Sequence, residues 1–162
     1  MKRTTVFLVL CWAAAALWMA LIFSFSAQPA SESSETSSPF VRAYLSLFHP
    51  EYGSLSPTEQ FELEEEASFR VRKTAHFSIY TILGALLFSA AARTVSASGL
   101  KIPLSFLIGA LYAVSDEIHQ SFVPGRSCEL RDMCIDSAGV LLGVLLCAGV
   151  ASLIRRRKQQ DR

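Results

Sequence analysis

Four long apolar segments dominate the pattern of hydrophobic and polar positions along the chain. They cover residues 6–26, 75–92, 102–118 and 133–154. A helix needs about 20 mostly apolar residues to cross a hydrocarbon core of about 30 Å. The first segment contains no charged residue, whereas each of the other three carries ionisable side chains near one end. The pattern therefore predicts an all-α fold: a polytopic membrane protein in which a small bundle of four transmembrane helices forms one domain over residues 1–162.

The loop between the first two segments, residues 27–72, carries two helix-start signals. The Ser- and Glu-rich stretch before Ser38 is typical of a solvated linker. Ser38 and Pro39 then resemble an N-cap followed by proline at the first helical position, which predicts a short interfacial helix. Ser56 and Glu59 have the spacing of a capping box, so a second helix is expected to start there and to run into the second span.

Lysine and arginine set the expected orientation, because they favour the cytoplasmic side of a membrane. With both termini in the cytoplasm, the inner side holds nine basic residues: Lys2, Arg3, Arg93, Lys101, Arg155, Arg156, Arg157, Lys158 and Arg162. The outer side then holds six: Arg42, Arg70, Arg72, Lys73, Arg126 and Arg131. The loop 27–72 is therefore expected to be extracytoplasmic. Residues 6–26 could instead be a cleaved signal peptide, but the run is longer than a usual apolar signal core, which favours a retained anchor.

Composition supports a membrane protein and argues against several other classes. Hydrophobic residues make up 51% of the chain and charged residues 18%, whereas soluble domains usually contain about 25% charged residues. The formal net charge of +1 gives no reason to expect a nucleic-acid partner. Four cysteines are too few for a disulfide scaffold. Cys128 and Cys134 could pair in an oxidising exterior, although nothing in their spacing requires it.

Polar side chains recur at helical spacing near the outer end of three spans. They are Lys73, His76 and Tyr80 in the second span, Tyr112, Asp116, Glu117, His119 and Gln120 in the third, and Asp132 and Asp136 in the fourth. Gly139 and Gly143 continue the acidic stripe of the fourth span, and small residues four apart let helices approach closely. We therefore expect the Asp132 and Asp136 face to turn into the bundle.

The depth of Asp116 suggests that these side chains share one site. Asp116 lies fourteen residues after Ile102, about 21 Å along a helix, and therefore several ångströms below the outer surface of the core. An isolated carboxylate there costs at least about 2.5–3.5 kcal/mol, so it needs a partner. The candidate partners are Lys73, His76 and Arg126, because a Pro-Gly turn can fold Arg126 back over the carboxylates.

Two other interpretations of this cluster remain open. Interfacial cations and tyrosines often anchor helix ends, so the cluster could be a structural ion-pair lock. The side chains of His76, Asp116, His119, Asp132 and Asp136 could also supply metal ligands. The duplicated Glu-x-x-His signature of di-metal bundles is absent, however, and we expect neither a metal nor another cofactor.

The same residues carry a resemblance to the VanZ-like family of bacterial membrane proteins. The matching stretches are residues 23–28, 72–77, 112–126 and 132–136, followed by Gly139 and Gly143. The most specific of them is the string Asp-Glu-x-His-Gln-x-Phe-x-Pro-Gly-Arg that ends at Arg126. The family's motif positions fall on His76, Asp116, Glu117, His119, Gln120, Arg126, Asp132 and Asp136. The family takes its name from a protein linked to low-level teicoplanin resistance, so the resemblance implies the bacterial inner membrane and an envelope role.

The first functional hypothesis is binding of a membrane lipid or a lipid-linked wall precursor. An outward-facing polar pocket would hold an anionic headgroup, which could influence glycopeptide susceptibility. Arg126 would supply a bidentate fork and Lys73 a point charge. The further ligand-binding candidates are Tyr80, Glu117, Gln120, Asp132 and Asp136.

The second hypothesis is a hydrolase or transferase that acts on a lipid-linked envelope substrate. His119 or His76 would be the general base, positioned by Asp116 or Asp136, and Arg126 would stabilise developing negative charge. No Walker loop, zinc signature or nucleophile motif supports this enzymatic hypothesis. Transport of a proton or small solute ranks last, because the inner halves of the spans carry no ionisable relay.

Overall fold

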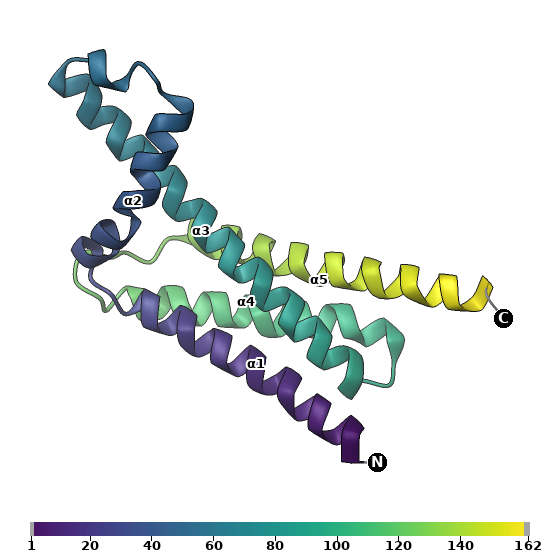
Figure 1. Ribbon diagram of the computed structural model, residues 1–162. Helices are drawn as coiled ribbons and strands as arrows, with labels where there is room; N and C mark the ends of the chain where they lie inside the picture. Colours follow the sequence, from purple (N-terminus) through teal and green to yellow (C-terminus); the bar gives the residue numbers. More distant parts are fainter. Residues whose placement is uncertain (1, 161–162) are drawn as a thin grey trace.

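The computed structural model describes residues 2–160, and within that range the chain is helical, without strands. The helices are α1 (Lys2–Ser26), α2 (Ala30–Phe48), α3 (Pro57–Thr94), α4 (Lys101–Gln120) and α5 (Leu130–Gln160), with short 3₁₀ turns η1 (Tyr52–Ser54) and η2 (Ser98–Leu100). Helices α1, α3, α4 and α5 are long and apolar enough to cross a membrane. The predicted all-α bundle of four spans is therefore confirmed. Each predicted span lies within one of these helices, and α1 begins at the same end of the bundle at which α5 ends (Figure 1).

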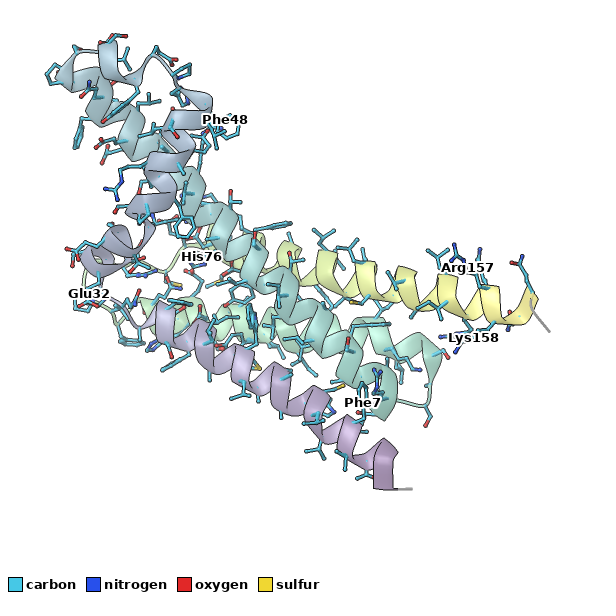
Figure 2. The ribbon with its side chains drawn as sticks, in the orientation of Figure 1. Phe7, Glu32, Phe48, His76, Arg157 and Lys158 are labelled. Carbon is cyan, nitrogen blue, oxygen red and sulfur yellow. The ribbon has the colours of Figure 1, made fainter. Side chains whose placement is uncertain are left out.

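Helix α3 is the central element of the bundle, because it packs against all four other helices. Its side chains Tyr80, Leu83 and Leu87 are fully buried in the main apolar core. The exposed basic run of α5, which includes Arg157 and Lys158, lies at the opposite end of the bundle from His76 of α3 (Figure 2). The bundle therefore has one strongly basic end and one end at which polar side chains enter the core.

The crossing of α3 and α5 depends on glycine. A Cβ atom on Gly143 would lie 1.9 Å from the Thr81 carbonyl oxygen, and one on Gly139 would lie 2.5 Å from the Phe77 carbonyl oxygen. Contacts this short leave no room for a side chain, so the small residues allow the two backbones to touch. This confirms that the glycine stripe below Asp136 faces into the bundle.

Helix α3 continues without a break from the first loop into the second span, as the capping box predicted. The Ser56 side chain accepts a hydrogen bond from the Glu59 amide, and the Glu59 carboxylate accepts one from the Ser56 amide. The 38 residues of α3 make a helix about 57 Å long at 1.5 Å per residue. Its first part pairs with α2 through a small core of Val41, Leu45 and Ala67. We call α2, η1 and residues 57–70 the hairpin, and Figure 1 shows it leaning away from the bundle.

The expected start of the first loop helix was wrong. Helix α2 begins at Ala30, so the stretch predicted to be a linker is helical and Pro39 lies inside the helix. Two contacts explain the early start: the Ala30 amide donates to the Pro124 carbonyl at 3.2 Å, and the Ser34 hydroxyl donates to the Ala30 carbonyl at 2.9 Å. Pro39 is exposed, so water can reach the carbonyl that its missing N–H leaves without a helical partner.

Candidate functional site

Polar groups from α1, α3 and α4 meet around one buried carboxylate. They do so at the end of the bundle where α1 and α4 finish and α5 begins, which we call the site end. The Asp116 side chain of α4 belongs to a residue only 2% exposed. Its Oδ2 atom accepts hydrogen bonds from the Ser26 hydroxyl at 2.7 Å, the Tyr80 hydroxyl at 3.0 Å and the Gln120 amide at 3.2 Å. Three donors compensate for the loss of water around this oxygen.

The partners of Asp116 differ from those expected. Neither Lys73 nor His76 contacts it; in the described part of the chain these two side chains pair with carboxylates of α5 instead. Lys73 forms an ion pair with Asp132, and His76 Nδ1 lies 3.5 Å from Asp136 Oδ1. Lys73 and His76 lie three residues apart on α3, and the two aspartates lie four apart on α5, so each pair occupies one face of its helix. Because the two helices pack closely, each basic side chain of α3 lies opposite one aspartate of α5.

Asp136 is the most enclosed of these acids. The residue is 0% exposed, and within residues 2–160 neither of its carboxylate oxygens has a hydrogen-bond donor in good geometry. The His76 ring, which is half-buried, is the titratable group that the structure brings within ion-pair distance of it. Asp136 is thus placed to orient the His76 ring.

Arg126 returns to the site end, as the Pro-Gly turn predicted, but it does not pair with a carboxylate. The turn needs Gly125 at φ 74°, a conformation that favours glycine. Arg126 donates to the Gln120 side-chain oxygen at 3.1 Å, to the Gln28 carbonyl at 3.1 Å and to the Phe25 carbonyl at 3.5 Å. Arg126 therefore binds the C-terminal end of α1 through hydrogen bonds to uncharged oxygen atoms. Burial lowers the pKa of the Arg126 guanidinium below its ordinary value.

The remaining predicted site residues lie on other sides of α4. Glu117 is fully buried and accepts a hydrogen bond from the Glu129 amide at 3.0 Å, which ties α4 to the start of α5. His119 stacks on the Phe23 ring of α1, with the ring centroids 4.4 Å apart. The Tyr112 hydroxyl donates to the Met19 carbonyl at 2.7 Å. The structure thus unites His76 with an aspartate but gives His119 no carboxylate partner among the described residues.

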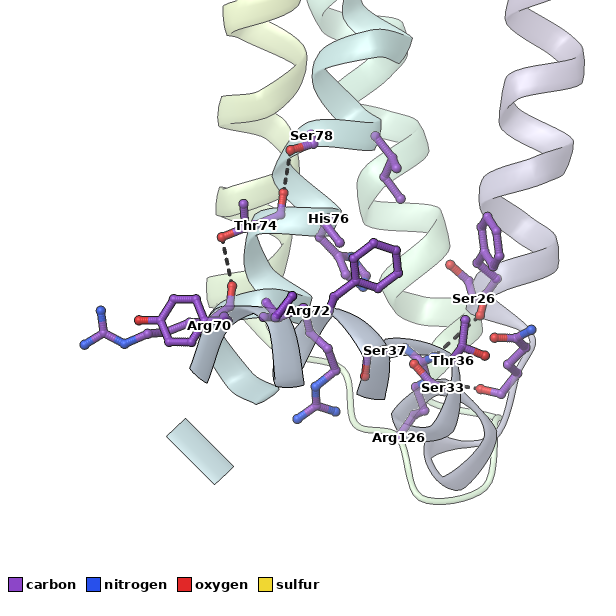
Figure 3. Close-up of a pocket in the computed structure, with 18 of the residues that line it drawn as sticks. Ser26, Ser33, Thr36, Ser37, Arg70, Arg72, Thr74, His76, Ser78 and Arg126 are labelled. Carbon is purple, nitrogen blue, oxygen red and sulfur yellow. Dashed lines mark hydrogen bonds between the residues drawn. The ribbon is translucent and has the colours of Figure 1, made fainter. Parts of the chain in front are cut away.

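A cavity of about 560 Å³ opens beside this network, between the end of α1, α2 and α3 (Figure 3). Of the predicted site residues, His76 and Arg126 line it, together with Arg70 and Arg72. Its apolar wall consists of Phe25, Phe40, Tyr44, Leu47, Val71 and Ile79. Its hydroxyl groups come from Ser26, Ser33, Thr36, Ser37, Thr74 and Ser78. No Asp or Glu of the described residues lines it.

Sequence reasoning missed the α2 wall of this cavity because its first part was assigned to a linker and its second part to a helix in the membrane interface. Ser33, Ser37, Phe40 and Tyr44 recur at spacings of four, three and four residues, which place them on one helix face. That periodicity was the available signal. The predicted ligand-binding residues that stay outside the lining are Lys73, Tyr80, Glu117, Gln120, Asp132 and Asp136. Of these, Gln120 accepts a hydrogen bond from Arg126, which does line the cavity.

The described side chains do not assemble a recognisable metal centre. No group of three or more His, Cys, Asp or Glu side chains in residues 2–160 is arranged to hold a metal ion. Cys128 and Cys134 are free thiols, and both are exposed.

The fold and the polar site end together define a multi-pass membrane protein with a buried acidic network beside a basic cavity. A VanZ/LLP1 family model matches residues 11–154. The chain therefore belongs to the VanZ/LLP1 family, and the resemblance seen in the sequence is confirmed. The search of curated proteins found no match, and neither did the search of solved structures.

Proposed function

We propose that this protein binds the anionic headgroup of a membrane lipid or of a lipid-linked wall precursor in the cavity at the site end. The observation that carries the proposal is the charge of the lining. His76, Arg70, Arg72 and Arg126 face the cavity, and none of the described acidic residues does. Guanidinium groups recognise phosphate and carboxylate through paired hydrogen bonds. A basic, carboxylate-free cavity favours an anionic ligand.

The apolar wall favours a ligand that also carries a hydrocarbon tail. Phe40 and Leu47 line the cavity and are nevertheless 67% and 74% exposed. The apolar surface therefore continues from the cavity onto the outside of the hairpin, where a tail can follow it. Under the orientation that the lysine and arginine distribution favours, with both termini cytoplasmic, the cavity faces the exterior of the bacterial inner membrane.

Ligand retention by the purified full-length chain tests this proposal. An anionic phospholipid is added in neutral detergent and its retention is measured by native mass spectrometry. Arg126→Gln should weaken binding about 10- to 100-fold, because a hydrogen bond to a charged group contributes about 1.5–3 kcal/mol. Arg42→Gln is the matched control, since Arg42 is exposed on α2 and lies outside the cavity lining. Equal retention by the two variants would argue against the site.

The envelope role proposed from the family name needs a separate measurement in cells. Expression of the protein in a susceptible bacterium should change its susceptibility to teicoplanin. The change should disappear with Arg126→Gln and persist with Arg42→Gln. An unchanged susceptibility on expression of the unaltered chain would remove this role and leave the binding proposal standing.

A second candidate function is hydrolysis or group transfer on a lipid-linked envelope substrate. His76 lines the cavity, and its Nδ1 atom lies 3.5 Å from the fully buried Asp136. A histidine held by a carboxylate can act as a general base toward a ligand in the cavity. His119 lacks both features in the described structure. Turnover of labelled envelope lipids that His76→Ala abolishes and His119→Ala preserves would favour catalysis, whereas stoichiometric binding without product would reject it.

A further inference from the structure

Arg72 is an arginine of the cavity wall that has no hydrogen-bond or ion-pair partner among the described residues. Its neighbours on α3 are engaged: Arg70 forms an ion pair with Glu66 at 2.7 Å, and Lys73 pairs with Asp132. Within residues 2–160, Arg72 makes no hydrogen bond or ion pair, although its side chain is half-buried. Its guanidinium nitrogens are still reached by solvent, so their donors are available to a ligand. Its position in the lining means that a ligand can supply the missing acceptor.

Arg126 gives the same cavity a second guanidinium. Figure 3 shows Arg72 and Arg126 at the same end of the cavity, one from α3 and the other from the turn between α4 and α5. The two are close enough for the charge of Arg72 to lower the pKa of Arg126, in addition to the effect of burial. The three acceptors of Arg126 are all neutral. Two like charges held together favour a ligand with more than one negative charge.

The lining also indicates which headgroups the cavity disfavours. An ammonium group, such as that of a zwitterionic phospholipid, is best held by a carboxylate, and none of the described carboxylates lines the cavity. The hydroxyls of Thr36 and Thr74 donate to carbonyls of their own helices. Their free lone pairs can accept hydrogen bonds from ligand hydroxyls. The cavity thus offers three guanidinium groups, of which the one at Arg70 is already paired, and several neutral polar atoms, but none of the described carboxylates.

We propose that Arg72 and Arg126 together hold the phosphate of an anionic amphiphile that carries no ammonium group, so that the cavity selects against zwitterionic phospholipids. This inference rests on the proposed function and names the ligand class of the same site. A phosphomonoester carries a charge of about −1.5 to −2 at neutral pH and offers three acceptor oxygens, enough for both guanidinium groups. A diphosphate on an isoprenyl chain offers the same chemistry with one more phosphate.

The test compares four short-chain probes on the purified full-length protein in neutral detergent. They are dihexanoyl phosphatidic acid, farnesyl diphosphate, dihexanoyl phosphatidylglycerol and dihexanoyl phosphatidylcholine. Affinities are measured by microscale thermophoresis. Phosphatidic acid or farnesyl diphosphate should bind at least about 10-fold more tightly than phosphatidylcholine, because each offers the two guanidinium groups more than one negative charge and brings no ammonium group into the cavity. The tighter of the two identifies a monophosphate or a diphosphate as the preferred headgroup.

Arg72→Gln provides the decisive variant, because Arg72 has no hydrogen bond or ion pair with the described part of the protein to lose. Without ligand, its melting temperature should equal that of the unaltered chain. Its affinity for the preferred anionic probe should fall about 10- to 100-fold, as expected for a lost charge-assisted hydrogen bond. Its affinity for phosphatidylcholine should stay the same. Arg72→Lys should recover part of the loss, because lysine restores the charge but not the paired donors. Arg42→Gln should bind all four probes like the unaltered chain.

Two results would overturn the inference in distinguishable ways. Equal affinity for all four probes, with Arg126→Gln still weakening them, would refute the selectivity and leave the proposed binding site standing. An equal loss of affinity for anionic and zwitterionic probes in Arg72→Gln would also refute the selectivity and leave the binding site standing. Failure of every probe to bind the unaltered protein would refute the proposed function together with the inference.

Discussion

Replacement of Gly143 by alanine tests the contact that aligns α3 with α5. The added Cβ atom would lie 1.9 Å from the Thr81 carbonyl oxygen and 2.9 Å from the Ala85 amide nitrogen. Both neighbours are main-chain atoms, so a side-chain rotation cannot relieve the clash. The helices would have to separate by about 1 Å before the closer contact reached 3.0 Å. Overpacking typically costs about 1–3 kcal/mol, and the gain in helix propensity from glycine to alanine offsets about 1 kcal/mol of it.

The assay is unfolding of the purified protein in mixed micelles by sodium dodecyl sulfate, followed by far-UV circular dichroism. Gly143→Ala should unfold at a lower detergent fraction than the unaltered chain. Gly149→Ala is the matched control, because Gly149 lies on the same helix and an added Cβ there meets nothing within 4 Å. That variant should be as stable as the unaltered chain or slightly more so. Equal midpoints for the two alanine variants would refute the close approach of α3 and α5.

Three further predictions use the same unfolding assay. Tyr80→Phe removes the hydroxyl that donates to Asp116 at 3.0 Å, and the free energy of unfolding should fall by about 1.5–3 kcal/mol; an unchanged midpoint would contradict this buried bond. Gly125 has φ 74°, so Gly125→Ala should lower the free energy of unfolding by about 1–2 kcal/mol, and Gly125→Asn should lower it less. Equal losses in the two variants would show that the backbone conformation is not the cause. Lys73→Asp should destabilise the protein by facing Asp132 with a like charge. Adding Asp132→Lys should restore most of the stability, and a double-mutant cycle without coupling would count against the pair.

The helices of the bundle could be predicted from the sequence because their signals are local. Each span is an apolar block of sufficient length, and the start of α3 is encoded by the reciprocal bonds of Ser56 and Glu59. Helix α2 was predicted only in part, since its first turns are rich in serine and glutamate. That segment is helical because Ala30 bonds to the Pro124 carbonyl and Val41 packs on Ala67. Local composition carries no information about these distant contacts.

The candidate site was also predictable only in part: the helical spacing of its residues could be seen in the sequence, but their partners in three dimensions could not. The periodicity of α3 and α5 was enough to predict that their polar faces meet, as Lys73 and Asp132 do. The choice of partner was not predictable, because it depends on the axial offset between helices. Asp116 accepts a hydrogen bond from Ser26 of α1, which lies in the matching stretch 23–28 but was given no role. A polar pocket was predicted but most of its lining was not, since its wall depends on where α2 docks.

The unbroken length of α3 has a mechanical consequence. A hydrocarbon core is about 30 Å thick, so a helix of about 57 Å extends well beyond it on one side. The hairpin is built on that extension, and the segment that carries Arg72 and His76 belongs to the same rigid rod. We therefore expect a partner or surface that tilts the hairpin to move those two side chains with it, because no break in α3 separates them from the hairpin.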